Sequence, residues 1–464
     1  MPTIKPAHLP RRSRVGRAFL LALFLFSLPA AIQAAEETQA TASDDERLDD
    51  VEEQVEVLAE ELGRLRSIFV VPEEIAYESF SGLGPAASKV YKRDRGLSIG
   101  GYGEVRLRKF VDKEDDDEDD IFDALRAVLY TGYKFNENWV VNSELEFEHG
   151  GTSGGGSVSL EFLTVDYLWR DEANARVGLL LIPMGFVNEI HEPNFFFGAE
   201  RPEVERRILP STWRENGAGL FGTIADVVDY RVYAVNGFDG SGFDSNGLRG
   251  GRQKGSEALA NDFAFVGRVD VHPAPGLMLG GSLWVGQSGQ DQDNTGIDGV
   301  TRNLPDALTT VYELHAQYKA HGASLRWLWT EAFVDDAGSL SRSLDKGYSD
   351  VPAGSGTRVF TDPSAGIARH MRGWYAEAGY DVIPWLLEES KMSLEPFFRY
   401  EFYDTQHDVA GAYTRDRSKK IDLFIGGLQF KPIPQVVFKV DYRHFEPDDG
   451  HKANQVQALV GYVF

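Results

Sequence analysis

Residues 435–464 read QVVFKVDYRHFEPDDGHKANQVQALVGYVF and contain two runs in which apolar and polar side chains alternate. In the first run, the even positions 436–442 carry Val, Phe, Val and Tyr, and the odd positions 437–443 carry Val, Lys, Asp and Arg. The second run, 454–464, ends on an aromatic residue. Successive side chains of a β-strand point to opposite faces, so one face of each run suits lipid and the other suits water. The two runs predict antiparallel strands joined by the polar loop 447–453.

The same period of two continues back to Leu97 and defines sixteen candidate strands. Their connections alternate, because those after odd-numbered strands are long and polar and those after even-numbered strands are short turns. This organisation is typical of bacterial outer-membrane barrels, whereas a soluble β-sandwich, the alternative, would not sort its loops so strictly. We therefore predict an all-β fold, a 16-stranded antiparallel transmembrane β-barrel over residues 97–464. The strands are expected to start near Leu97, Ile121, Trp139, Ser157, Asn174, Asn216, Val227, Asp262, Gly276, Leu308, Gly322, His370, Lys391, Lys420, Gln435 and Asn454.

Residues 1–35 have the pattern of a secretory signal peptide. Four arginines between Arg11 and Arg17 precede the apolar run 18–28, and small residues follow up to position 35. The apolar run is too short to span a bilayer, although a short membrane anchor is the alternative interpretation. Export would allow disulfides, but the chain has no cysteine. A closed barrel offers another source of stability, because every strand edge is paired.

Residues 36–69 begin with a polar stretch and continue with apolar residues at spacings of three and four from Leu48 to Phe69. This seam predicts a short periplasmic coiled coil, with one helix from each subunit of a trimer. A lone amphipathic helix is the alternative. The segment 70–96 contains Pro72, Gly82 and Pro85 and is predicted to be a linker.

The charge pattern excludes one class of partner. A formal net charge of −25 argues against nucleic-acid binding, which needs a basic surface.

Eight of the nine residues in Asp112–Asp120 are acidic, so this loop could hold Ca²⁺ or Mg²⁺ and bridge to lipopolysaccharide. A solvated loop without metal is the favoured interpretation, because the run lacks the glycine turn and spaced ligands of an EF-hand.

Motifs for catalysis are missing from the sequence. It has no Gly-x-Ser-x-Gly nucleophile elbow, no His-Glu-x-x-His and no phosphate-binding Gly-Lys-Ser/Thr loop. We therefore predict that the protein is not an enzyme and uses no cofactor or metal. A hydrolase embedded in the barrel is the less favoured alternative.

The third long connection, 183–215, is the candidate constriction. It has 33 residues, carries the aromatic run Phe195–Phe197 and mixes acidic with basic residues. A loop of this length with apolar side chains must pack against something, and the inner barrel wall is the nearest surface. We expect the loop to fold into the lumen. An outward loop that caps the mouth or contacts a neighbouring subunit is the alternative.

Five short stretches around this loop resemble one family. Ala175–Gly178 (ARVG), Pro183–Phe186 (PMGF), Glu205-Arg206, Leu209-Pro210 and Gly217–Gly219 (GAG) resemble the strand-to-loop segment of the phosphate-selective porin O and P family. This resemblance implies a trimeric, 16-stranded outer-membrane channel with a folded-in third loop. It also implies that arginines and a few lysines line a path for anions.

The period of two independently places a set of cations on the lumen face. Carboxylates such as Glu144, Glu146 and Glu148 share this face and could cancel the cations, so a general or weakly selective pore is favoured over strict phosphate selectivity. The candidates for the constriction and anion path are Arg106, Arg126, Arg268, Arg326, Arg399, Lys439 and Arg443 on strands, and Arg201, Arg206, Arg207 and Arg214 in the loop.

These observations predict a water-filled porin for passive diffusion of small hydrophilic solutes and ions across the bacterial outer membrane. Its expected partners are outer-membrane lipid, lipopolysaccharide, two further copies of the chain in a homotrimer, and small anions as permeants. A structural tether with a plugged barrel is the alternative from another functional class. The width of sixteen strands favours the channel, since a barrel of this size encloses water.

Overall fold

Residues 1–72 and 73–464 form two separate units in the computed structural model. The structure describes residues 54–59, 79–113, 119–387, 390–451 and 453–464. The predicted signal peptide, most of the predicted coiled coil and residues 114–118 of the acidic loop lie outside the described residues. Residues 54–59 are helical, with exposed side chains. In the described part of the chain, no helix is both long enough and apolar enough to cross a membrane.

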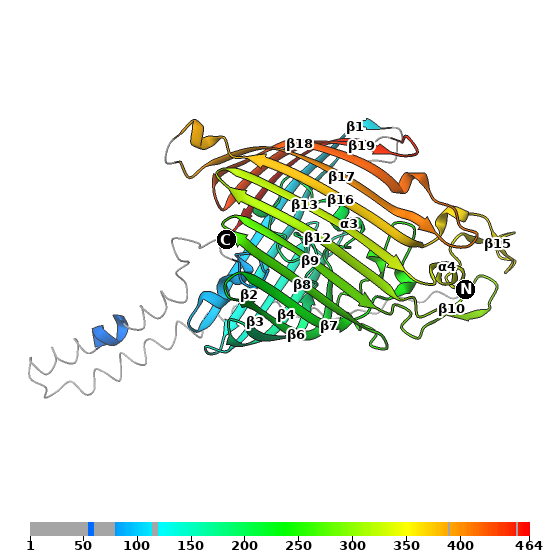
Figure 1. The fold of residues 1–464 in the computed structure, drawn as a ribbon, viewed down its shortest axis with the longest axis horizontal. Coiled ribbons are helices and arrows are strands. Elements are labelled where there is room, and N and C mark those ends of the chain that lie inside the picture. Colours follow the sequence, from blue (N-terminus) through cyan, green and yellow to red (C-terminus); the bar gives the residue numbers. More distant parts are fainter. Residues whose placement is uncertain (1–53, 60–78, 114–118, 388–389, 452) are drawn as a thin grey trace, which may run out of the picture. The chain divides into compact units, whose positions relative to one another are not determined.

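Sixteen antiparallel strands close into a barrel in the second unit, with β1 paired to β20 (Figure 1). The strands are β1 (Gly96–Lys113), β2 (Ile121–Lys134), β3 (Trp139–Glu148), β4 (Ser157–Arg170), β5 (Ala173–Leu181), β6 (Arg214–Ile224), β7 (Val228–Asn236), β8 (Phe263–Ala274), β9 (Leu277–Gly286), β12 (Thr309–Ala320), β13 (Ala323–Val334), β16 (Ala368–Tyr380), β17 (Ser393–Val409), β18 (Lys420–Ile433), β19 (Val436–Pro447) and β20 (Ala453–Val463).

The connections carry short elements of their own. Two small sheets pair β10 (Asp293–Thr295) with β11 (Thr301–Asn303) and β14 (Tyr348–Asp350) with β15 (Arg358–Phe360). The helices are α3 (Glu203–Arg207), α4 (Ala337–Ser343), and the 3-10 turns η1 (Ala87–Lys92), η2 (Pro193–Phe195), η3 (Gly240–Gly242), η4 (Arg249–Gly251), η5 (Pro363–Ala365), η6 (Ile383–Trp385) and η7 (Arg417–Lys419).

The predicted fold class is confirmed, and every barrel strand begins within two residues of its predicted start. The long connections lie at one end of the barrel, here named the loop end (Figure 1). The short connections and the C-terminus lie at the other, here named the turn end.

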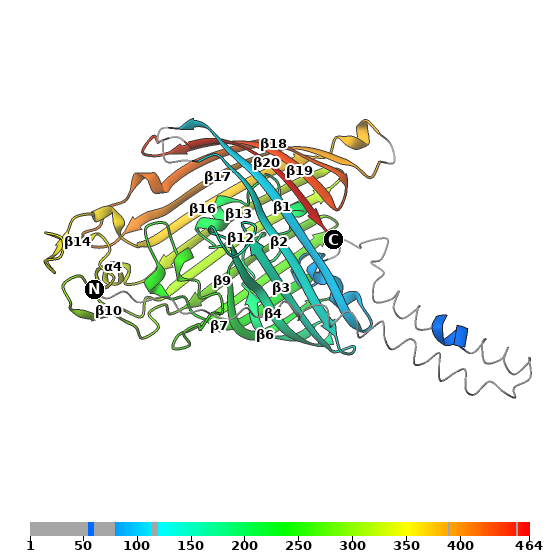
Figure 2. The same ribbon diagram turned by 180° about the vertical axis from the view of Figure 1, so that it is seen from behind.

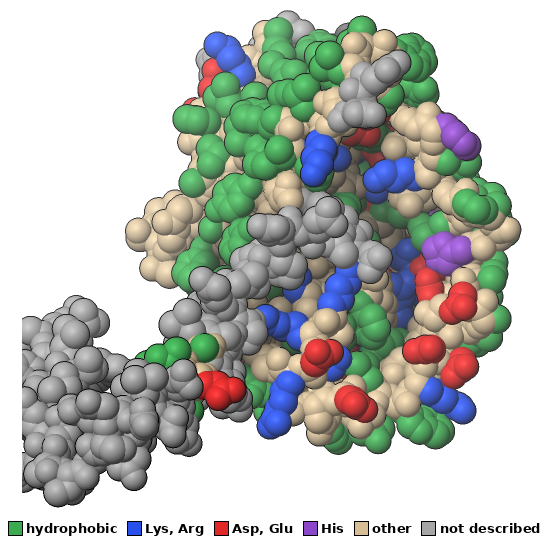
Figure 3. Space-filling view, turned by 90° about the vertical axis from the view of Figure 1, so that its left-hand side faces the viewer, with side chains coloured by type: hydrophobic (Ala, Val, Ile, Leu, Met, Phe, Trp, Pro, Cys, Tyr) green, Lys and Arg blue, Asp and Glu red, His purple; other side chains and the backbone are tan. Residues whose placement is uncertain are grey.

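Alternation along each strand explains how the barrel wall forms. On β19, Val440 points outward and is 44% exposed, whereas Lys439 and Asp441 point into the lumen and are 3% exposed. Hydrophobic side chains cover much of the outer wall, and Lys and Arg side chains gather in the hollow at the turn end (Figure 3). An apolar outer band around a polar interior is the pattern of a barrel that sits in lipid.

The largest buried cluster lies inside the barrel, where loops pack on the wall. Trp213 stacks on Phe238 with ring centroids 4.6 Å apart, and Phe238 contacts Trp284 at the same distance. Trp213 and Phe238 lie in two different connections, and Trp284 lies on β9. The loops after β5 and β7 are therefore fixed in place by aromatic packing.

Candidate pore and its constriction

The loop between β5 and β6, residues 182–213, enters the lumen and reaches the opposite wall. We name it the crossing loop. The Lys439 ammonium on β19 donates to the carbonyl of Phe196 at 2.6 Å and to that of Gly198 at 3.0 Å. The backbone N–H of Ala199 donates to the Asp441 carboxylate at 2.6 Å. The loop thus starts beside β5 and is held by β19, which confirms the expected infolding.

Further contacts hold the short helix of this loop. Glu401 accepts from the backbone N–H of Val204 at 3.0 Å. Glu205 accepts from the Tyr375 hydroxyl at 2.6 Å and from two backbone N–H groups at the start of the loop. Burial disfavours ionised Glu203, but Arg206, Arg443 and Arg207 outweigh burial and lower its pKa to about 2. These bonds fix the crossing loop, including its short helix α3, against the barrel wall.

Six of the seven predicted wall cations bind the crossing loop. Their positive charges are therefore committed to carbonyls and carboxylates that hold the loop across the lumen. The pairs are Arg268 with the Gly185 carbonyl, Arg326 with the Phe195 carbonyl, Arg399 with the Phe197 carbonyl, Lys439 with the Phe196 carbonyl, Arg106 with the Glu200 carboxylate, and Arg443 with the Glu200 and Glu203 carboxylates.

The remaining wall cation, Arg126, and the predicted loop cations have other surroundings. Arg214 at the start of β6 is buried and pairs with Glu161 at 2.9 Å. Arg126 pairs with Glu104 at 2.7 Å, which offsets its charge. Arg106, Arg126, Arg201 and Arg206 line a hollow on the loop side of the crossing loop, here named the outer vestibule. The prediction that the eleven cations form one anion path stays a prediction.

A second hollow adjoins the outer vestibule, since Arg206 and Arg249 line both. We name it the basic recess. Five cations line it, together with Asp244, Asn246 and Gly250: Arg206, Arg207, Arg249, Arg252 and Lys254. Three of the five come from the loop between β7 and β8, which the sequence did not single out.

Arg249 and Arg252 are held by backbone carbonyls of the crossing loop. Arg252 donates to the carbonyls of Ser211 and Thr212, both at 2.8 Å, and Arg249 also donates to the Ser211 carbonyl. Within the described residues, neither guanidinium forms an ion pair with a carboxylate. Burial, and after it repulsion from neighbouring arginines, lowers the pKa of Arg249 to about 9 and that of Arg252 to about 10. These two guanidiniums thus place fixed positive charge in the recess, and Asp244 is the one acidic residue among its described lining residues.

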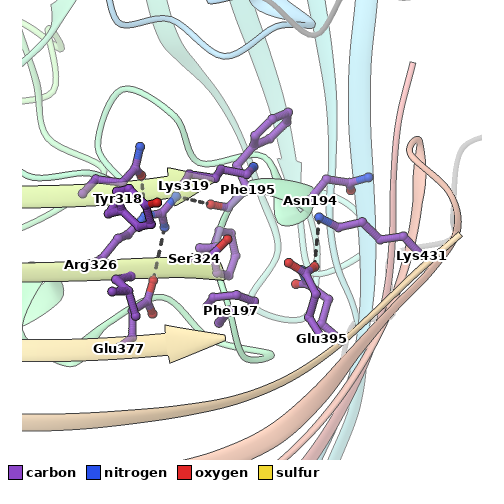
Figure 4. A pocket seen from close by; sticks show the side chains of 14 residues that line it. Asn194, Phe195, Phe197, Tyr318, Lys319, Ser324, Arg326, Glu377, Glu395 and Lys431 are labelled. Atoms are coloured by element: carbon purple, nitrogen blue, oxygen red, sulfur yellow. Dashed lines mark hydrogen bonds and ion pairs between the residues drawn. The ribbon is translucent and has the colours of Figure 1, made fainter. Parts of the chain in front are cut away.

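A third hollow lies on the turn side of the crossing loop, lined by strands β12, β13, β16, β17 and β18 and by Asn194–Phe197 (Figure 4). We name it the inner pocket. It shares Phe196 with the outer vestibule, so the aromatic run of the crossing loop lies between the two hollows. The Lys439 ammonium lies 3.8 Å from the centre of the Phe196 ring. A solute that crosses the barrel here must pass this run.

The segment 79–92 also lies inside the barrel, near the turn end (Figure 2). We name it the plug. Val90 and Tyr91 are buried against the wall from β1 to β5, and Phe80 stacks on Tyr91 with ring centroids 4.1 Å apart. The Tyr91 hydroxyl donates to Asp166 at 2.7 Å. Residues 80–91 of the predicted linker are therefore packed in the lumen.

The plug touches the crossing loop as well as the wall. The backbone N–H of Ala86 donates to Glu192 at 3.0 Å, and Asn142 on β3 donates to the Ala87 carbonyl at 2.8 Å. The wall carries Gly132 where the plug is closest, since a Cβ there would lie 2.7 Å from two atoms of Val90. The wall is thus shaped to fit the plug.

Comparisons with known proteins agree with the fold. No protein-family model matches the chain. OmpF of Salmonella typhi, in complex with daunomycin, aligns with a TM-score of 0.51 at 12% identity over 80% of this chain and 98% of that one. An anion-selective porin from Comamonas acidovorans aligns with a TM-score of 0.48 at 14% identity over 80% of this chain and 100% of that one. The first of these likenesses shows a porin-like fold.

One sequence relative is much more similar. An uncharacterized protein of Aquifex aeolicus (strain VF5) is 35% identical over 408 residues, which cover 86% of this chain and 87% of that protein. Identity at this level over most of both chains shows common descent rather than shared architecture alone. The chain belongs to the same protein family as this Aquifex aeolicus protein, and its fold is a porin-like barrel of sixteen strands.

Proposed function

We propose that this protein is a channel of the bacterial outer membrane through which small hydrophilic solutes and ions diffuse. Two observations support the proposal: sixteen strands are enough to enclose an aqueous lumen, and the outer wall is apolar while the inner wall is charged. On this proposal the loop end faces the cell exterior, in contact with lipopolysaccharide, and the turn end faces the periplasm.

We further propose that the channel prefers anions. The basic recess carries this proposal, because Arg249 and Arg252 are anchored to carbonyls and have no carboxylate partner among the described residues. Two unit charges about 6 Å apart at an effective dielectric constant near 20 interact by roughly 2–3 kcal/mol before screening. Local charge at the narrow part of a pore sets which ions it contains. The likeness to phosphate-selective porins agrees with this preference, and phosphate selectivity itself stays a prediction.

The test of the channel proposal is the conductance of the purified protein in a planar lipid bilayer. We expect steps of current, and in a gradient of potassium chloride a zero-current potential displaced toward that of chloride. A second candidate, a structural tether with a plugged barrel, is favoured by the plug and the crossing loop, which fill much of the lumen. Absence of conductance from a correctly folded, membrane-inserted barrel would favour the tether.

We also propose a homotrimer, from the predicted coiled coil and the family resemblance. The expected mass of the detergent-solubilised protein, after subtraction of bound detergent, is that of three chains. Light scattering coupled to size-exclusion chromatography measures it. A mass equal to one chain would contradict the proposal.

A further inference from the structure

A hollow on the outer wall of the barrel, here named the lateral hollow, is lined by two charged side chains as well as by aromatic rings. It lies over β13, β16 and β17, which are neighbours in the barrel (Figure 1), and it holds about 480 Å³, within the range of small-molecule sites. Its charged residues are Glu331 on β13 and Arg372 on β16, which are register partners. A Cβ at Gly373 would lie 3.1 Å from Val204 of the crossing loop, so Gly373 faces the lumen. Its neighbours Arg372 and Trp374 therefore face outward.

Arg372 brings a positive charge to this hollow without a partner. Within the described residues its guanidinium forms no hydrogen bond or ion pair, and its Nε is buried, which leaves the terminal Nη groups to donate into the hollow. Asp404, its register partner on β17, already pairs with Arg415 and His407. The Cζ of Arg372 lies 5.6 Å from the centre of the Phe402 ring. A cation on a lipid-facing wall is costly when it has no partner, and an anion from outside the protein would satisfy it.

Glu331 adds a hydrogen-bond acceptor beside this cation. Its Oε2 accepts from the Tyr312 hydroxyl at 2.9 Å and lies 3.2 Å from Nε2 of His370. No donor among the described residues reaches its other oxygen, Oε1, and the side chain is 16% exposed. The hollow thus offers a donor for an anion next to an acceptor for a hydroxyl or amide N–H. This pair suits a phosphorylated sugar better than a bare phosphate ion, which the Glu331 carboxylate would repel.

The aromatic rings place the hollow near the edge of the bilayer. Trp329 and Trp374 are register partners, and Trp374 contacts Tyr400 with ring centroids 4.9 Å apart. Trp and Tyr gather where lipid headgroups meet the hydrocarbon. Arg372 lies eight residues from Tyr380, at the turn end of β16. At about 3.4 Å per residue and a tilt of about 40°, this is a height of about 20 Å, close to the top of an apolar band about 25 Å tall.

The wall between the hollow and the turn end is apolar. Leu325, Trp327 and Phe398 point outward from it and are exposed. A surface that is charged at the headgroup level and apolar below matches a single amphiphilic molecule, with its head in the hollow and its acyl chains along the wall. The side of a second barrel is broad and convex, so few of its groups would enter a hollow of this size.

We propose that the lateral hollow binds the phosphorylated sugar headgroup of an outer-leaflet glycolipid, the lipid A part of lipopolysaccharide. A phosphate of the lipid would accept from Arg372, and a hydroxyl or amide N–H of the sugar would donate to Glu331. The assignment rests on the proposed function, which places the loop end at the cell exterior, and it goes beyond that function because the hollow lies outside the channel.

Native mass spectrometry of the purified, detergent-solubilised protein measures the binding of lipid A. Two forms of the lipid are compared, one with its phosphates and one from which the phosphates have been removed. We expect the phosphorylated form to bind about tenfold more tightly, a typical effect for hydrogen bonds to a charged group. Equal affinity of the two forms, or displacement of the phosphorylated form by millimolar inorganic phosphate, would overturn the inference.

Variants of single arginines test the assigned cation. Arg372→Gln is expected to weaken binding of the phosphorylated form about tenfold and to leave binding of the dephosphorylated form unchanged. Arg372→Lys keeps the charge and should keep most of the affinity. Arg170→Gln is the matched control, because Arg170 at the turn end of β4 also lies beside a tryptophan, with its Cζ 4.2 Å from the centre of the Trp169 ring. Parental affinity in Arg372→Gln, or an equal loss in Arg170→Gln, would contradict the assignment.

Two further measurements separate this site from the channel and from a contact between subunits. Arg372→Gln should keep the parental conductance, since Arg372 faces away from the lumen. Lipid binding is measured without current, so absence of current in the parental protein would contradict the channel alone. If Arg372→Gln instead lowers the mass in detergent to that of one chain and leaves lipid A binding unchanged, the hollow is a contact between copies and the inference is wrong.

Discussion

Replacing Arg249 and Arg252 together by alanine is expected to lower the ratio of anion to cation permeability about thirtyfold. Both guanidiniums line the basic recess, and the carbonyls of residues 210–212 hold them there. Screening by salt in an open recess reduces each interaction to about 1 kcal/mol, and two such charges contribute about 2 kcal/mol. The zero-current potential in a tenfold salt gradient measures the ratio.

A matched control separates local charge from net charge. Arg369 and Arg417 are 59% and 70% exposed and pair with Asp408 and Asp448 near the loop end. The double variant Arg369→Ala, Arg417→Ala removes the same total charge from outside the recess, so its zero-current potential should match that of the parental channel. If the recess variant also keeps the parental potential, or if the control shifts equally, the recess does not set selectivity.

The architecture of this protein follows from local pattern alone. Each barrel strand alternates with a period of two, and each pair is joined by a connection whose length shows the end it lies at. The predicted direction of the side chains, outward or into the lumen, is also confirmed on β19. Lys439 and Arg443 are buried in the lumen, as their odd positions predict. Neighbouring strands in an up-and-down barrel are neighbours in sequence, so no long-range pairing except β1 with β20 must be inferred.

The partners of the inward cations could not be predicted in the same way. The phase of Arg399 shows that it faces the lumen, but its bond to the Phe197 carbonyl depends on how a loop more than two hundred residues away crosses the barrel. The positive charge that has no carboxylate partner therefore lies where the crossing loop meets the loop between β7 and β8. One signal of the recess was present in the sequence, because three of its cations lie close together: Arg249, Arg252 and Lys254. Nothing local, however, shows that their loop turns toward the crossing loop.

The position of the plug inside the barrel could not be predicted from the sequence for a similar reason. Proline and glycine in residues 70–96 predict a break in regular structure, and η1 is indeed short. Whether such a segment stays outside a barrel or enters it depends on complementary wall positions. Gly100 is one of these, because a Cβ there would lie 2.8 Å from the carbonyl oxygen of Ala86. A strand glycine facing the lumen is informative only when its neighbour is known.

Displacing the plug is expected to raise the single-channel conductance roughly twofold or more, because conduction depends on the open width of the pore. Gly132→Val places a side chain where Val90 now lies. The wall strand is held by hydrogen-bond ladders on both sides, whereas the plug is held by apolar packing and a few side-chain bonds. The cost of overpacking, about 1–3 kcal/mol, should therefore move the plug rather than the wall.

Two further variants make this test decisive. Deletion of residues 79–92 removes the plug entirely and should raise conductance at least as much as Gly132→Val. Gly426→Val is the matched control, since a Cβ at Gly426, on the outer face of β18, meets no atom within 4 Å. Far-ultraviolet circular dichroism of each variant should show the parental strand signal, which confirms that the barrel is intact. Parental conductance in both plug variants with an intact barrel would show that the solute path avoids the plug. Conduction would then run along the opposite wall, past Phe196 and the inner pocket, and the crossing loop alone would limit it.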